Sequence, residues 1–197
     1  AEEQEARRAR LWRSADTVWR SMEAVWERAF VKLFERQASA TLARLEAPSR
    51  AKRWAKAAEA RELRVDLSQI PFDPEFWRVE TVETARGLVE MVVAQGASAT
   101  SAPFGVSFDL SDPWVRDLVE ARANQLAGQV TDTTYTAIKD ALSAGVGEGE
   151  GIPQLADRVR HVFDVASSSR ATTIARTEVI SAYNASAVGA AAALPGD

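Results

Sequence analysis

The glycine-rich stretch 145–151, which holds four glycines in seven residues, is the first place in this sequence to look for chemistry. Backbone amides in such a stretch can bind a phosphate group at the start of a helix. However, the spacing matches neither the dinucleotide-binding pattern nor the P-loop pattern, and no Lys-Ser/Thr pair follows. Glu148 and Glu150 would also repel a phosphate. We therefore expect a turn between two helices here and no nucleotide site.

His161 is the only histidine, and the sequence contains no cysteine. A zinc site would therefore lack ligands. Several carboxylates lie near His161 in the sequence, but they show no acid-base pairing pattern, and such residues are usually solvated. We predict no catalytic residue, no metal and no cofactor, and we expect that the protein is not an enzyme. The carboxylates in question are Glu148, Glu150, Asp157 and Asp164.

A polar string, Ile174-Ala175-Arg176-Thr177-Glu178, lies near the end of the chain and is followed by Asn184. Arg176 and Glu178 are two residues apart, so on a helix they point in different directions and each needs a partner on another element. We interpret the polar residues as a structural motif that fixes the register of a close, alanine-rich helix packing. The motif residues are Ile174, Arg176, Thr177, Glu178 and Asn184.

The elements that must position these residues are all predicted to be helices. Apolar residues recur at helical spacing from Glu2 to about Glu46, with no proline or glycine between them, which predicts one long amphipathic helix. Asp73-Pro74 and Asp112-Pro113 each combine an N-cap with proline at the first helical position. The expected helices after the first cover 49–64, 73 to a stop at Gly96, 112 through Leu142, a short helix from Pro153, and about 170–193 with Ser167–Ser169 as its cap.

No segment shows the sustained alternation of a strand, so the predicted fold is all-α: a long N-terminal amphipathic helix followed by a helical bundle, without a substantial sheet. We expect three parts: a long helix and helical arm over 1–95, a linker over 96–107 and a helical domain over 108–197. The chain begins without methionine and stops at a turn-like sequence. We expect both ends to be cuts in a longer protein.

Indole side chains are regularly spaced along the long N-terminal helix. Trp12, Trp19 and Trp26 are seven residues apart and Leu33 continues the series, as in the seam of a coiled coil. Two interpretations fit: residues of the same chain, such as Trp54 and Trp77, cover this stripe, or it binds a partner. The predicted protein-interface residues are Trp12, Trp19, Trp26, Phe30 and Leu33.

Charge is unevenly distributed along the chain. Residues 1–65 contain fifteen lysines and arginines against ten acidic residues, whereas residues 66–197 contain nine against eighteen. A basic arm favours contact with a polyanion such as DNA, and a solvated helix face is the simpler alternative. No apolar run is long enough for a membrane helix, so we expect no membrane contact. The candidate DNA contacts are Arg7, Arg8, Arg10, Arg13, Arg20, Arg50, Lys52, Arg53 and Lys56.

The second half of the chain resembles the phage head morphogenesis domain of Mu F-like minor head proteins. The resemblance covers roughly Phe108 to Gly189 and consists of Phe108-Asp109, a helix, the stretch 145–151 with Ile152, and a turn ending in Phe163. It continues through Arg170-Ala171 to the Ile-Ala-Arg-Thr-Glu string with Ala182 and Asn184, which is the most distinctive piece.

This resemblance implies a minor capsid protein of a tailed phage, made in the host cytoplasm and located inside the capsid at the portal vertex. The partners that it implies are the phage portal protein, with copies of itself and the phage genomic DNA as further candidates. The implied role is to assist head assembly, DNA packaging or DNA ejection. A DNA-binding protein inside the virion, using the basic N-terminal helices, is the alternative.

Overall fold

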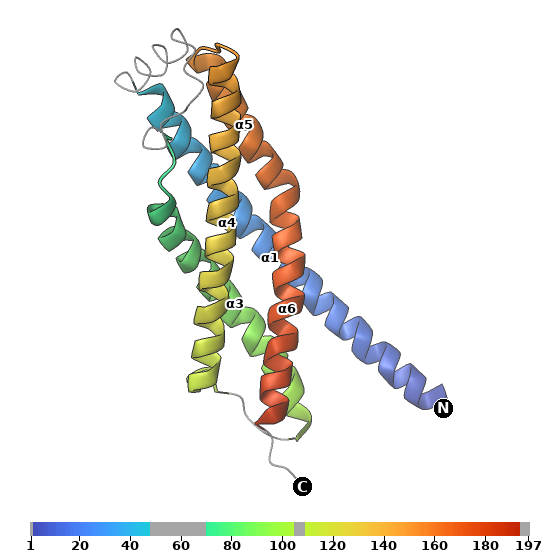
Figure 1. Ribbon diagram of the computed structural model, residues 1–197. Coiled ribbons are helices and arrows are strands. Elements are labelled where there is room, and N and C mark those ends of the chain that lie inside the picture. The colour runs from blue at the N-terminus through green and yellow to red at the C-terminus, as the bar shows by residue number, and fades with distance from the viewer. Residues whose placement is uncertain (1, 48–69, 105–108, 194–197) are drawn as a thin grey trace. The chain divides into compact units, whose positions relative to one another are not determined.

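The computed structural model describes residues 2–47, 70–104 and 109–193; within these ranges, the side chains of 2–15 and of 104 are left aside. Every regular element in these ranges is a helix and none is a strand, which confirms the all-α prediction (Figure 1). The predicted helix over 49–64 lies outside the described residues.

Helix α1 spans Glu2–Glu46, as predicted, and is drawn in blue to cyan in Figure 1. Its buried side chains recur every three or four residues, which is the period of one helix face. The face is apolar at first and then includes polar residues, because Gln37 and Thr41 are also fully buried. The buried positions are Met22, Trp26, Phe30, Leu33, Phe34, Gln37, Thr41 and Leu45.

Helix α3 spans Pro74–Ser101 and begins at the predicted cap, because the backbone amide of Phe76 donates to Asp73 Oδ1 at 3.1 Å. The predicted stop at Gly96 is wrong: the helix continues to Ser101, and a 3-10 turn, η2, follows over Ala102–Phe104. A Cβ atom at Gly96 would lie 2.7 Å from the backbone oxygen of Tyr183. The glycine therefore allows a close helix approach and does not end the helix.

Helix α4 spans Pro113–Gly147 and helix α5 spans Ile152–Val165, with the predicted turn between them. Gly149 adopts φ 75°, a left-handed conformation that favours glycine. The amide of Glu150 donates to the Gly145 carbonyl at 2.9 Å. Arg158 of α5 donates to Glu148 and to Glu150, each at 2.6 Å, and this interaction lowers the pKa of Glu150. The two glutamates therefore hold the turn in place through Arg158.

A π-helical turn, η3, over Ala166–Arg170 connects α5 to α6, which spans Ala171–Ala192. The predicted cap at Ser167–Ser169 is wrong, because the backbone stays helical and Ser169 Oγ donates to the Val165 carbonyl at 2.9 Å. Arg170, the last residue of this turn, contacts two distant elements: its guanidinium lies 4.7 Å over the Phe34 ring and donates to Thr134 Oγ1 at 2.5 Å. Burial lowers the pKa of Arg170.

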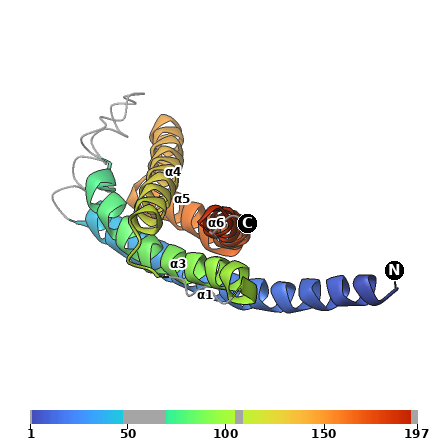
Figure 2. The same cartoon turned by 90° about the horizontal axis from the view of Figure 1, so that it is seen from below.

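The chain forms two compact units, and each unit combines segments from distant parts of the sequence. Unit 1 contains residues 1–29, 86–122 and 171–197, and unit 2 contains residues 30–85 and 123–170. Helices α1, α3 and α4 therefore supply residues to both units. The predicted boundary at 96–107 does not separate the units, since both take residues from either side of it. Within unit 2 the start of α3 lies beside the end of α1, as Figure 2 shows, and Arg36 of α1 pairs with Glu80 of α3.

Candidate interaction surfaces

The predicted interface on α1 is largely buried inside the protein. Trp26 and Phe30 have no exposed surface, and Leu33 is almost as completely covered. The interface prediction is wrong for these three residues, because other parts of the same chain cover them and leave nothing for a partner to contact. The period that suggested a coiled-coil seam is also the period of a core-facing helix.

Trp19 is the exception within the stripe, because it is only half-buried. Its ring meets Tyr183 of α6 edge to face, with the ring centroids 5.5 Å apart, and both residues belong to unit 1. The remaining predicted interface residue, Trp12, has a side chain outside the described residues.

The candidate DNA contacts fall mostly outside the described side chains. Arg20 is the one of them whose side chain is described; it is exposed and donates to Asp16, one turn earlier, at 2.9 Å. Among the described residues no helix is long and apolar enough to cross a membrane.

His161 lies on the exposed side of α5 in unit 2. It lines a shallow hollow with Glu150, Asp157 and Arg158, and Arg158 is already paired with Glu150. Within the described part of the chain no three His, Cys, Asp or Glu residues are grouped so that they could hold a metal ion. His161 therefore borders a partly exposed hollow in which Arg158 is already paired.

The polar motif near the end of the chain divides into a buried part and an exposed part. Glu178 is half-buried and faces Arg122 of α4 at 3.9 Å, while Arg122 also donates to Ser181 at 2.9 Å. The partner predicted for Glu178 on another helix is therefore present. Burial raises the pKa of Glu178, and the nearby Arg122 opposes this shift.

Arg176, in contrast, is exposed on α6 and makes no ion pair within the described part of the chain, so the predicted partner is absent there. Thr177 and Asn184 are also exposed, and Ile174 is half-buried. Glu178 thus has the predicted partner on another helix, whereas the exposure of Arg176, Thr177 and Asn184 contradicts the interpretation that these three residues fix the helix packing.

Two apolar residues that the sequence reasoning did not select complete this exposed face of α6. Ile180 is 39% exposed and Val188 is 70% exposed. Together with Arg176 and Asn184 they follow each other at intervals of four residues, which places them along one side of a helix. The four-residue spacing is visible in the sequence, but it identifies an exposed face only when the opposite side of α6 is known to be buried. We call this surface, made of Arg176, Thr177, Ile180, Asn184 and Val188, the α6 face.

The buried side of α6 is made of small residues that admit neighbouring helices closely. A Cβ atom at Gly189 would lie 2.5 Å from the ring of Trp114 on α4. Ala175, Val179, Ala182 and Ser186 are buried on the same side. Close packing on this side fixes α6 and leaves the α6 face directed outward.

Comparison of the chain with protein-family models, with curated proteins and with solved structures found no match.

Proposed function

We propose that the chain is a minor head protein of a tailed phage that acts by binding other virion proteins, the portal protein foremost, and so assists head assembly, DNA packaging or DNA ejection. In this proposal the protein lies inside the capsid at the portal vertex and performs no catalysis. The partner-binding surface is the α6 face and not the indole stripe of α1.

The observation that carries this proposal is the exposure of the most distinctive part of the motif. A string that served only to pack helices would be buried, yet Arg176, Thr177 and Asn184 are exposed beside Ile180 and Val188. Arginine is enriched at protein interfaces, and the core of an interface is more apolar than the rest of the protein surface. The helix that presents this face also places Glu178 3.9 Å from Arg122 of α4.

Co-purification tests the proposal. The chain is co-expressed with the portal protein of the phage that encodes it, and a tag on the chain recovers the complex. The variant R176E/V188D places a carboxylate at each end of the α6 face, and we expect it to reduce the recovered portal protein by about tenfold or more.

The matched control is R116E/V79D, which makes the same changes at an exposed arginine of α4 and an exposed valine of α3. The control should retain the portal protein, and both variants should keep the helical circular dichroism of the wild type. Equal recovery with R176E/V188D and with the control would overturn the assignment to the α6 face. Failure of the wild-type chain to recover portal protein would overturn the proposed function itself.

A further inference from the structure

An open groove of about 860 Å³ runs along unit 2 between α1 and the start of α3. Its α1 side carries three cations and one carboxylate, together with the small side chains of Ser39 and Ala40, and its α3 side carries Phe76 and Trp77. Phe76 is 48% exposed, whereas Trp77 is buried. A half-exposed aromatic ring beside several cations leaves apolar surface in water that a partner could cover.

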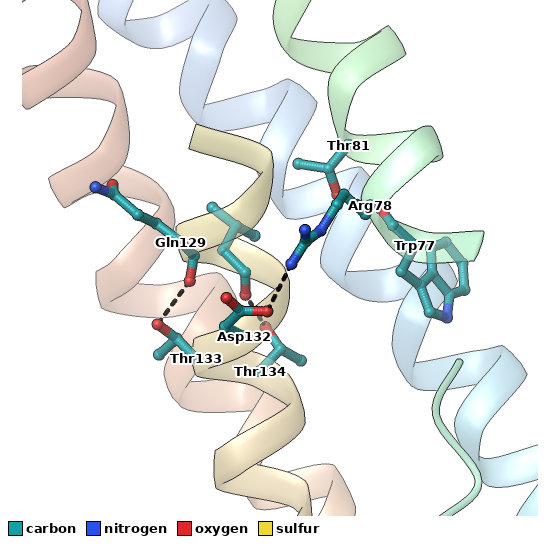
Figure 3. A network of polar contacts seen from close by, with 8 residues as sticks. Trp77, Arg78, Thr81, Gln129, Asp132, Thr133 and Thr134 are labelled. Atoms are coloured by element: carbon teal, nitrogen blue, oxygen red, sulfur yellow. Dashed lines mark hydrogen bonds and ion pairs between the residues drawn. The ribbon is translucent and has the colours of Figure 1, made fainter. Parts of the chain in front are cut away.

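The groove is held in shape by contacts on both sides of α3. Arg36 pairs with Glu80, and its guanidinium lies 5.9 Å from the centre of the Trp77 ring. Figure 3 shows Arg78 reaching to Asp132 on α4, at 3.0 Å, while Trp77 projects from another side of α3. The Phe76 ring meets Trp77 edge to face at 5.0 Å. A partner would therefore bind a largely preformed surface, which lowers the entropy lost on binding.

The charged side chains that line the groove are three cations, Lys32, Arg36 and Arg44, and one carboxylate, Glu35, so the groove carries a net positive charge. Arg36 is already paired with Glu80, whereas Lys32 and Arg44 make no ion pair within the described part of the chain. They are twelve residues apart on α1, which corresponds to about 18 Å along the helix. Two cations at this separation, in the same groove as Ala40 and the Phe76 ring, match a peptide that carries acidic residues on both sides of an apolar one.

We propose that this groove binds an acidic peptide segment of a partner protein, with an apolar side chain of the peptide against Phe76 and Ala40 and its carboxylates on Lys32 and Arg44. A single-stranded nucleic acid fits less well, because it needs a continuous positive track for its phosphates, whereas here Arg36 is occupied by Glu80 and Glu35 interrupts the row of cations on α1. Trp77 is too deeply buried to stack on a base. This proposal does not depend on the portal contact.

Fluorescence anisotropy tests the proposal with a fluorescein-labelled peptide in which glutamates flank a central leucine. We expect K32E/R44E to raise the dissociation constant of this peptide by at least about tenfold. Removing the exposed ring in F76A should raise it by about fivefold to tenfold. The same peptide with glutamines in place of glutamates should bind the wild type more weakly than the glutamate peptide does, and its binding should change little in K32E/R44E.

Control variants are R116E for the charge change and V79A for the apolar change, since both residues are exposed and neither lines the groove. Weakening by R116E equal to that by K32E/R44E would overturn the proposal, because binding would then be general charge attraction. Unchanged binding by F76A would also overturn it. A labelled single-stranded oligonucleotide that binds more tightly than the peptide and is lost in K32E/R44E would assign the groove to nucleic acid. A dimer seen by sedimentation and dissolved by F76A would assign it to a second copy.

Discussion

Replacing Trp26 with alanine separates the two interpretations of the indole stripe. Trp26 has no exposed surface, so the substitution leaves a large cavity in unit 1. Truncations of buried tryptophan to alanine typically cost about 3–5 kcal/mol. This is a large share of the roughly 5–15 kcal/mol that stabilises a typical protein. We therefore expect Trp26→Ala to destabilise the fold strongly.

Trp19→Ala is the matched comparison, because it removes the same side chain from the same helix and the same unit. Trp19 is only half-buried, and its edge contact with Tyr183 is of a kind that contributes about 0.5–1.5 kcal/mol beyond the area it covers. Urea unfolding of both variants, followed by circular dichroism, measures the difference. We expect the midpoint of Trp26→Ala to lie well below that of Trp19→Ala.

A result in which Trp26→Ala and Trp19→Ala unfold at the same urea concentration as the wild type would refute this reasoning. The indoles would then add little to the fold, and the partner interface predicted on α1 would have to be restored. Trp26→Ala is also unsuitable as an interface variant, because loss of partner binding would follow from loss of the fold.

Two further predictions concern a glycine and a half-buried carboxylate. Gly96→Ala should cost about 1–3 kcal/mol in urea unfolding because its Cβ would meet the Tyr183 backbone, whereas Gly87→Ala, with no atom within 4 Å of its Cβ, should be neutral or stabilise by up to about 1 kcal/mol. Equal effects would show that α3 does not approach α6 closely. Burial disfavours the charged form of Glu178 and so raises its pKa in the folded state above the ordinary value of 4.5. The stability that the protonated carboxyl contributes is therefore fully present below about pH 4.5 and is lost as the pH rises through the folded-state pKa. The wild type should therefore gain stability relative to Glu178→Gln as the pH falls from 7 to 4.5, and a relative loss would show that Arg122 outweighs the cost of burial.

Local signals in the sequence were sufficient for most helix bounds. The Asp73-Pro74 and Asp112-Pro113 pairs act within one turn, and α3 and α4 begin where they predict. The glycines at 145–151 likewise act locally, because the conformation of Gly149 needs no distant partner. Where an element depended on tertiary contacts, the prediction failed. The sequence predicts a stop at Gly96 because it does not reveal how this glycine packs against α6.

The prediction for the link between α5 and α6 also failed because this link depends on tertiary contacts. Ser167–Ser169 have the composition of a cap, but Arg170 reaches Phe34 and Thr134, which are far from it in the sequence, and the backbone stays helical as a π turn. Local propensity is a weak preference that such contacts override.

The candidate surfaces were the least predictable part. A periodic apolar stripe has the same appearance whether it faces a core or a partner, so the stripe on α1 could not be assigned from the sequence. Phe76 and Ile180 became candidates only when their exposure was known, because an isolated apolar residue in the sequence is normally assumed to be buried.

The interleaved make-up of the two units limits how binding regions can be mapped by truncation. Neither unit is a continuous stretch of the sequence, and a cut anywhere between residues 30 and 170 removes strongly packed segments from both. If a shortened chain fails to bind, the cause would be the loss of a packed unit, and the result would not identify the residues that contact the partner. Point substitutions at exposed positions are the approach suited to this protein.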